Sequence, residues 1–201
     1  MGQDKAFVSW EGSTLLRRAL EVTHSVASVT CIVGARAKFA PYGSVVEDIF
    51  PERGPLGGIH AALSTSDREL NLILAVDLPF VTAELLTFLI ECAQDTRDMA
   101  TVPQLVTGWE PLCAVYRREF AKVAERALKK GQNAVHRLLE GEEGRTGVCA
   151  GVRAIDEREL EVAGFPARSF RNINTVADLQ SGEQGGAAGA AAPIVEGLNS
   201  K

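Results

Sequence analysis

Asp77 is the acidic residue best placed for chemistry, because it directly follows the apolar run Asn71–Val76 (NLILAV). An unbroken apolar run of this length is typical of a parallel strand that is buried on both faces. Ligands of open α/β sheets bind at the carboxyl ends of such strands, where this aspartate would lie. Mg²⁺ prefers oxygen ligands and substrate phosphates, so a carboxylate here could hold it. The alternative interpretation is that Asp77 caps the turn before Pro79.

A second group of candidates lies in the segment VVEDIFPERGPLGG. The glycines of GPLGG, among them Gly57 and Gly58, would let a ligand approach the backbone, and the helix that follows would offer free N–H groups. Asp48 ends the preceding strand at the same edge of the sheet and could accept hydrogen bonds from a sugar hydroxyl or a base. The alternatives are an ordinary turn shaped by Pro55 and a solvated loop aspartate.

Lys5 and two asparagines complete the set of candidates. Lys5 follows Asp4 in the opening stretch MGQDKA, and a lysine beside a Gly-rich turn could neutralise a phosphate as a point charge. Asn172 and Asn174 are two residues apart in FRNINTVADL, so in an extended segment their side chains point the same way. Both could ligate Mg²⁺ or orient phosphates. Lys5 could equally be a surface lysine, and Asn174 could cap the last helix.

The elements that would position these residues alternate between helices and strands. Helical periodicity predicts helices at 13–27, about 59–66, from Thr82 onward, 117–129 and 133–140, and β-rich runs predict strands at 29–33, 44–47, 71–76, 99–102, 111–116 and, later, about 148–155 and 167–171. This alternation predicts a layered α/β domain with a mostly parallel central sheet over residues 1–180. The Gly/Ala-rich stretch 181–201 lacks a sustained period and is predicted to be a flexible tail.

Composition excludes several classes of protein. A length of 201 residues with 46% hydrophobic residues suits one globular domain, and a net charge of −5 argues against a duplex-binding protein. The four cysteines lack metal-site spacing and indicate a reducing cytosol. The three histidines, His24, His60 and His136, are scattered and are interpreted as structural or surface residues. No run approaches the length of a membrane span.

Taken together, five stretches resemble the molybdenum cofactor guanylyltransferases, a family of α/β nucleotidyltransferases. These stretches are MGQDKA, VVEDIFPERGPLGGIHAAL, AVDLPFV, EPLCAVYRR and NINTVADL, in the family's order and near its spacing. Each is modest alone, but five in order are specific. The resemblance implies a Rossmann-like three-layer nucleotidyltransferase domain that transfers GMP from GTP to the terminal phosphate of molybdenum-carrying molybdopterin and releases pyrophosphate.

The resemblance also implies roles for the candidate residues. Asp77 would hold Mg²⁺ and, with Lys5, carry the catalysis, while Lys5, Asp48 and Asp77 would bind the nucleotide. Asn172 and Asn174 would bind the pterin or the metal, and the loop containing Gly57 and Gly58 would lie under the nucleotide or the pterin. The implied setting is a cytoplasmic monomer whose further partners are molybdoenzyme apoproteins or their chaperones.

One departure from the family concerns the start of the chain. The family begins with a strand and a loop of the form L-A-G-G-x-S-x-R-M-G, and this chain starts at the final Met-Gly of that motif. The missing strand would lie in the middle of the sheet, where unpaired backbone groups are costly. We therefore expect the natural protein to extend upstream of Met1, and we expect a gap or an irregularity at the centre of the sheet.

Two other functions stay open at this level. A molybdopterin cytidylyltransferase would share the fold and the chemistry but use CTP, and base choice depends on a few pocket residues near Val33–Ala35 and Asp48. A non-catalytic remnant would bind the nucleotide or the pterin and transfer nothing, as the incomplete phosphate loop would allow.

Overall fold

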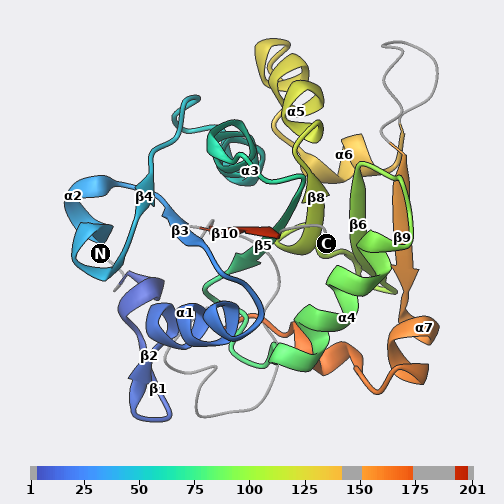
Figure 1. The fold of residues 1–201 in the computed structure, drawn as a ribbon, viewed down its shortest axis with the longest axis horizontal. Coiled ribbons are helices and arrows are strands. Elements are labelled where there is room, and N and C mark those ends of the chain that lie inside the picture. Colours follow the sequence, from blue (N-terminus) through green and yellow to red (C-terminus); the bar gives the residue numbers. More distant parts are fainter. Residues whose placement is uncertain (1–3, 142–150, 174–192, 199–201) are drawn as a thin grey trace.

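The computed structural model describes residues 4–141, 151–173 and 193–198. In these residues one large sheet is covered on one face by α1 and α4 and on the other by α3 and α5 (Figure 1). The helices are α1 (Leu15–Val26), α2 (Arg36–Phe39), α3 (Gly54–Thr65), α4 (Ala83–Gln94), α5 (Phe120–Lys129), α6 (Val135–Leu139) and α7 (Glu157–Val162). No helix in these ranges is both long and apolar enough to span a membrane.

The large sheet has eight strands in the described residues, in the order β4-β3-β10-β5-β8-β6-β7, with β9 paired to β6. Its strands are β3 (Thr30–Val33), β4 (Val45–Val46), β5 (Leu70–Ala75), β6 (Ala100–Leu105), β7 (Gly108–Trp109), β8 (Cys113–Arg117), β9 (Val152–Asp156) and β10 (Pro193–Leu198), while β1 (Ser9–Trp10) and β2 (Ser13–Thr14) form a separate hairpin. Five strands, β3, β4, β5, β6 and β9, point the same way. The predicted three-layer α/β domain with a mostly parallel sheet is confirmed.

β5 is the best buried strand because all six of its residues are inaccessible to water. Its side chains alternate between the two faces of the sheet, as strand geometry requires. Leu72 and Leu74 join the hydrophobic cluster under α1 and α4, whereas Ile73 joins the cluster under α3 and α5. The apolar run that follows Arg68 and Glu69 therefore forms the central contact between two hydrophobic layers.

The centre of the sheet is filled by the C-terminal strand. β10 lies between β3 and β5 and is antiparallel to both, with Pro193 opposite Ala75 and Leu198 opposite Leu70. The expected gap is therefore absent, and the irregularity is one of direction, because a reversed strand separates two strands that run the same way. These six residues belong to the stretch 181–201 for which the sequence predicted a flexible tail, and the structure places them within the fold instead.

The late elements differ from the prediction in one place. The predicted strand near 148–155 is present as β9, and the helix predicted at 133–140 is present as the shorter α6. The segment predicted as a strand at 167–171 forms a 3₁₀ turn, Ala167–Phe170, instead. Pro166 precedes this turn and lacks an N–H group to donate to a neighbouring strand.

Removing β10 is predicted to destabilise the protein strongly. A chain cut after Gln180 leaves the facing edges of β3 and β5 unpaired, and each lost hydrogen bond costs about 0.5–1.5 kcal/mol. The sum approaches a domain's whole stability of about 5–15 kcal/mol, so thermal unfolding followed by circular dichroism should show a midpoint lowered by roughly 10 °C or more. Removing residues 199–201 alone is the control, and an unchanged midpoint after the longer deletion would contradict the placement of β10.

Candidate functional site

The predicted site residues that the structure describes lie toward one edge of the sheet, because β3, β4 and β5 share a direction and end there (Figure 1). Asp48 lies two residues beyond the end of β4, and Asp77 lies two residues beyond the end of β5. This is the edge at which open α/β sheets bind their ligands.

Lys5 and Asp77 contact each other although 72 residues separate them. Lys5 Nζ lies 3.4 Å from Asp77 Oδ2, which is both an ion pair and a hydrogen bond. Lys5 begins a short 3₁₀ turn that Asp4 caps, since Asp4 Oδ1 accepts a hydrogen bond from the backbone N–H of Ala6 at 3.1 Å. Asp4 also pairs with Lys38. These two contacts hold the opening stretch in place, so that Lys5 reaches the end of β5.

Asp77 is a buried acid, and only 7% of its surface is exposed. Burial raises the pKa of Asp77, and the neighbouring Lys5 ammonium opposes this effect. The backbone carbonyl of Asp77 accepts a hydrogen bond from the N–H of Ile173 at 3.0 Å. The bond brings the FRNIN segment to the same edge, where Asn172 is exposed to solvent. Asn174 lies outside the described residues.

Asp48 and the predicted glycines form the second part of the site. Gly57 and Gly58 are buried in the first two turns of α3. A Cβ atom at Gly57 would lie 3.1 Å from the carbonyl oxygen of Phe50 and 3.9 Å from Asp48 Oδ1, so the loop can approach the helix only because Gly57 has no side chain. Asp48 is exposed as a residue, but its carboxylate is sheltered enough that partial burial raises its pKa, an effect that His60 opposes.

His60 supports this loop from inside α3. Its Nε2 lies 3.1 Å from Ser64 Oγ, and its ring meets the Phe50 ring edge-on at 5.1 Å between centroids. Its buried Nδ1 has no hydrogen-bond partner among the described residues, and burial lowers the pKa of the imidazole. The interpretation of His60 as a structural residue agrees with this position, but its closeness to Asp48 is not apparent from their separation in the sequence.

Glu110 is the one acidic neighbour of Asp77 in the described residues that the sequence interpretation missed. Burial, and after it the negative charge of Asp77, raises the pKa of Glu110 to about 7. Its residue type and its place at the start of EPLCAVYRR were the available signals. What could not be read is that this motif enters β8, which runs antiparallel beside β5 and so begins where β5 ends.

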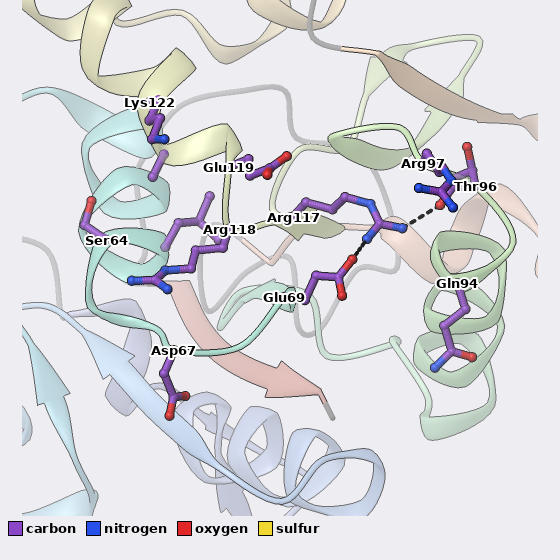
Figure 2. A pocket seen from close by; sticks show the side chains of 12 residues that line it. Ser64, Asp67, Glu69, Gln94, Thr96, Arg97, Arg117, Arg118, Glu119 and Lys122 are labelled. Atoms are coloured by element: carbon purple, nitrogen blue, oxygen red, sulfur yellow. Dashed lines mark hydrogen bonds and ion pairs between the residues drawn. The ribbon is translucent and has the colours of Figure 1, made fainter. Parts of the chain in front are cut away.

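A hollow of about 1000 Å³ lies at the opposite edge of the sheet, near the start of β5 (Figure 2). Arg117 is its most constrained wall residue: it pairs with Glu69 and donates to the carbonyl oxygen of Thr96 at 2.5 Å, next to the end of α4 (Figure 2). None of the predicted site residues lines it. The size of this hollow alone therefore does not identify it as the functional site. We interpret Arg117 as a structural residue that connects β8 with the end of α4.

The raised pKa of Glu110 predicts that the stability of the protein depends on pH. Because the pKa of Glu110 is higher in the folded protein than its ordinary 4.5, the folded state binds more protons between about pH 4.5 and 7, and stability falls as the pH rises through that window. With divalent cations chelated, Glu110→Gln should be more stable than the wild type at pH 7.5 by about 1–2 kcal/mol, a figure discounted for partial exposure. The difference should vanish near pH 4. Chemical unfolding at both pH values measures it, and equal stability at pH 7.5 would contradict it.

The Gly57 contact predicts a second effect. Gly57→Ala forces the Phe50 carbonyl away from α3, which should lower stability by about 1–3 kcal/mol and displace Asp48. The thermal midpoint should fall with the lost stability. A thermal melt checks this effect, and an alanine variant that retains the wild-type midpoint would show that the loop is free to move.

Comparisons with known proteins show the family to which this chain belongs. The sequence model of the MobA-like NTP transferase domain family matches residues 1–148. The molybdenum cofactor guanylyltransferase of Desulfosudis oleivorans is 34% identical over 187 residues, covering 90% of this chain and 87% of that protein. The probable molybdenum cofactor guanylyltransferase of Pyrococcus furiosus is 30% identical over 189 residues, covering 89% of this chain and 88% of that protein.

A solved structure shows the same fold. The crystal structure of molybdopterin-guanine dinucleotide biosynthesis protein A from Archaeoglobus fulgidus superposes with a TM-score of 0.72 at 27% identity, covering 89% of this chain and 88% of that chain. The residues matched by the family model include Lys5 and Asp77. This chain belongs to the family of MobA-like NTP transferases.

Proposed function

We propose that this chain transfers GMP from GTP to the terminal phosphate of molybdenum-carrying molybdopterin and releases pyrophosphate. The relatives at 30–34% identity are named molybdenum cofactor guanylyltransferases, which supports the choice of donor and acceptor. The observation that carries the proposal is the Lys5–Asp77 contact of 3.4 Å at the ligand-binding edge of the sheet. A cation and an acid fixed together there are what a site for a nucleoside triphosphate and its metal requires.

The reaction asks the protein for alignment and for charge neutralisation. An oxygen of the acceptor phosphate attacks the α-phosphorus of GTP and forms the new P–O bond. The bond from the α-phosphorus to its bridging oxygen breaks, and that oxygen leaves with the electron pair as part of pyrophosphate. Negative charge grows on the leaving group, and the Lys5 ammonium at this edge would stabilise it.

Asp77 is proposed to hold the Mg²⁺ ion that this chemistry uses. When bound, Mg²⁺ would supply Lewis-acid chemistry to the triphosphate. The residues fit the ion, because Asp77 is a buried carboxylate at the ligand-binding edge and Glu110, a second carboxylate, precedes the strand β8 that pairs with β5 there. Among the described residues no three His, Cys, Asp or Glu side chains gather, so the remaining ligands would be water and substrate oxygens.

The remaining roles follow from position. Asp48, above the first turn of α3, would accept hydrogen bonds from the nucleotide, and Gly57 and Gly58 let the substrate or the loop approach that helix. Asn172, tied to the Asp77 loop through its neighbour Ile173, would contact the pterin or the metal, together with Asn174. We further propose a cytoplasmic monomer that delivers its product to molybdoenzyme apoproteins or their chaperones.

The proposal predicts a loss of transfer when either member of the Lys5–Asp77 pair is removed. Asp77→Asn and Lys5→Gln should each lower the rate of dinucleotide formation roughly 10²–10³-fold, because each removes charge that the transition state needs. Lys122→Gln, at the opposite edge of the sheet, is the matched control and should keep the wild-type rate. The measurement is chromatography of the product and release of pyrophosphate from GTP, with molybdenum-molybdopterin as the acceptor.

Three other outcomes decide between the alternatives. Faster turnover with CTP than with GTP would make the chain a cytidylyltransferase. Binding of GTP without any transfer would identify a non-catalytic nucleotide-binding remnant. Full activity of Asp77→Asn would remove the assigned site while leaving the family membership untouched.

A further inference from the structure

Glu110 and Asp77 are brought together by one backbone hydrogen bond between neighbouring strands. The N–H of Ala75 donates to the carbonyl oxygen of Leu112 at 2.7 Å, at the point where β5 ends and β8 is about to begin. Asp77 lies two residues beyond this bond along one chain segment, and Glu110 lies two residues before it along the other. Strand pairing therefore fixes both acids at the same corner of the sheet.

The backbone around Glu110 is held on both sides. Its N–H donates to the carbonyl oxygen of Pro103 at 3.0 Å, and its own carbonyl oxygen accepts from the N–H of Cys113 at 3.1 Å, which closes a turn. The backbone of Asp77 is held in turn by the N–H of Ile173 at 3.0 Å. The two carboxylates thus project from fixed backbones, as the ligands of a metal site do.

The side chain of Glu110 lacks a partner that would explain its position. It is only partly exposed, and in the part of the chain that the structure describes no hydrogen bond or ion pair reaches its carboxylate. The nearby ammonium, Lys5, contacts Asp77 instead. Glu110 thus lies beside the Asp77 corner without an ion pair of its own among the described residues, and partly buried carboxylates in such a place are stable when a cation joins them.

We propose that Asp77 and Glu110 hold one divalent cation between them, so that Glu110 is a second protein ligand of the metal. The inference rests on the proposed function, because the ion is the one that the transfer reaction uses. Two carboxylates, with water and triphosphate oxygens, form a coordination shell that Mg²⁺ accepts. With the cation supplying positive charge to Asp77, the Lys5 ammonium can turn toward the phosphates of the nucleotide.

The first test measures metal affinity and not turnover. Mn²⁺, which stands in for Mg²⁺, is titrated into the full chain with GTP and without the acceptor, and the unbound ion is counted by electron paramagnetic resonance. Glu110→Gln should weaken Mn²⁺ binding about tenfold or more, since losing even an outer partner of a ligand costs 10–100-fold. Glu110→Asp should recover part of the loss. Glu119→Gln, which removes an acid at the opposite edge of the sheet, is the matched control and should bind like the wild type.

A second measurement uses only the wild-type protein, so it holds even where a variant fails to fold. Fe²⁺ replaces the bound ion, and ascorbate with peroxide generates radicals that cut the backbone near the metal. Mass spectrometry of the fragments should find cuts beside both Asp77 and Glu110. Cuts beside Asp77 alone would overturn the assignment of Glu110.

The outcomes separate this inference from the proposed function. Wild-type binding that Glu110→Gln leaves unchanged overturns the role of Glu110 and leaves the Asp77 site and the transferase proposal standing. No binding of Mn²⁺ by the wild type, even with GTP, overturns the metal site as a whole, and the transfer assay then decides independently whether the chain moves GMP.

Discussion

The structure depends on the complete burial of β5. Its backbone lies between two hydrophobic layers, so water cannot satisfy its N–H and C=O groups, and both of its edges require a paired strand. β10 supplies one edge and β8 the other. The pairing of β5 with β8 also affects the functional edge, because Asp77 follows the end of β5 and Glu110 precedes the start of β8. The demand for backbone pairing in the core thus decides which acids meet at the surface.

Electrostatics at this edge oppose stability and favour ligand binding. Burial raises the pKa values of Asp77 and Glu110, which means that their ionised forms cost the folded protein free energy. A fold selected for stability alone would replace one of them with an amide. Lys5 offsets part of this cost for Asp77, and it comes from the opening stretch, which its own cap and the Asp4–Lys38 pair hold in place. Functional sites often carry such an unrelieved charge, because the ligand relieves it.

The sequence predicts the parts of this site whose signals are local. A buried strand followed by Asp77, a glycine pair opening a helix and a lysine beside a turn can each be recognised within ten residues, and the structure joins Lys5 to Asp77 and Asp48 to Gly57. Glu110 was missed because its meaning lies in the register of β8 against β5, and periodicity does not encode register between distant strands.

β10 was missed for a different reason. Six residues with Pro193 at one end and Glu196 and Gly197 within them read as part of a polar, glycine-rich tail, and β propensity disfavours all three residue types. These residues form a strand because they pair with both β3 and β5. This tertiary pairing overrides their local preference.

The position of β10 also has a consequence for biosynthesis. The ribosome makes β3 and β5 well before β10, so the pairing of β10 with these two strands forms only after residues 193–198 have left the exit tunnel. Pairing that joins residue 30 to residue 196 closes a long loop, and contacts of such high sequence separation form slowly. The contacts of β10 are therefore expected to form late in folding, after the helices and the local strand pairs.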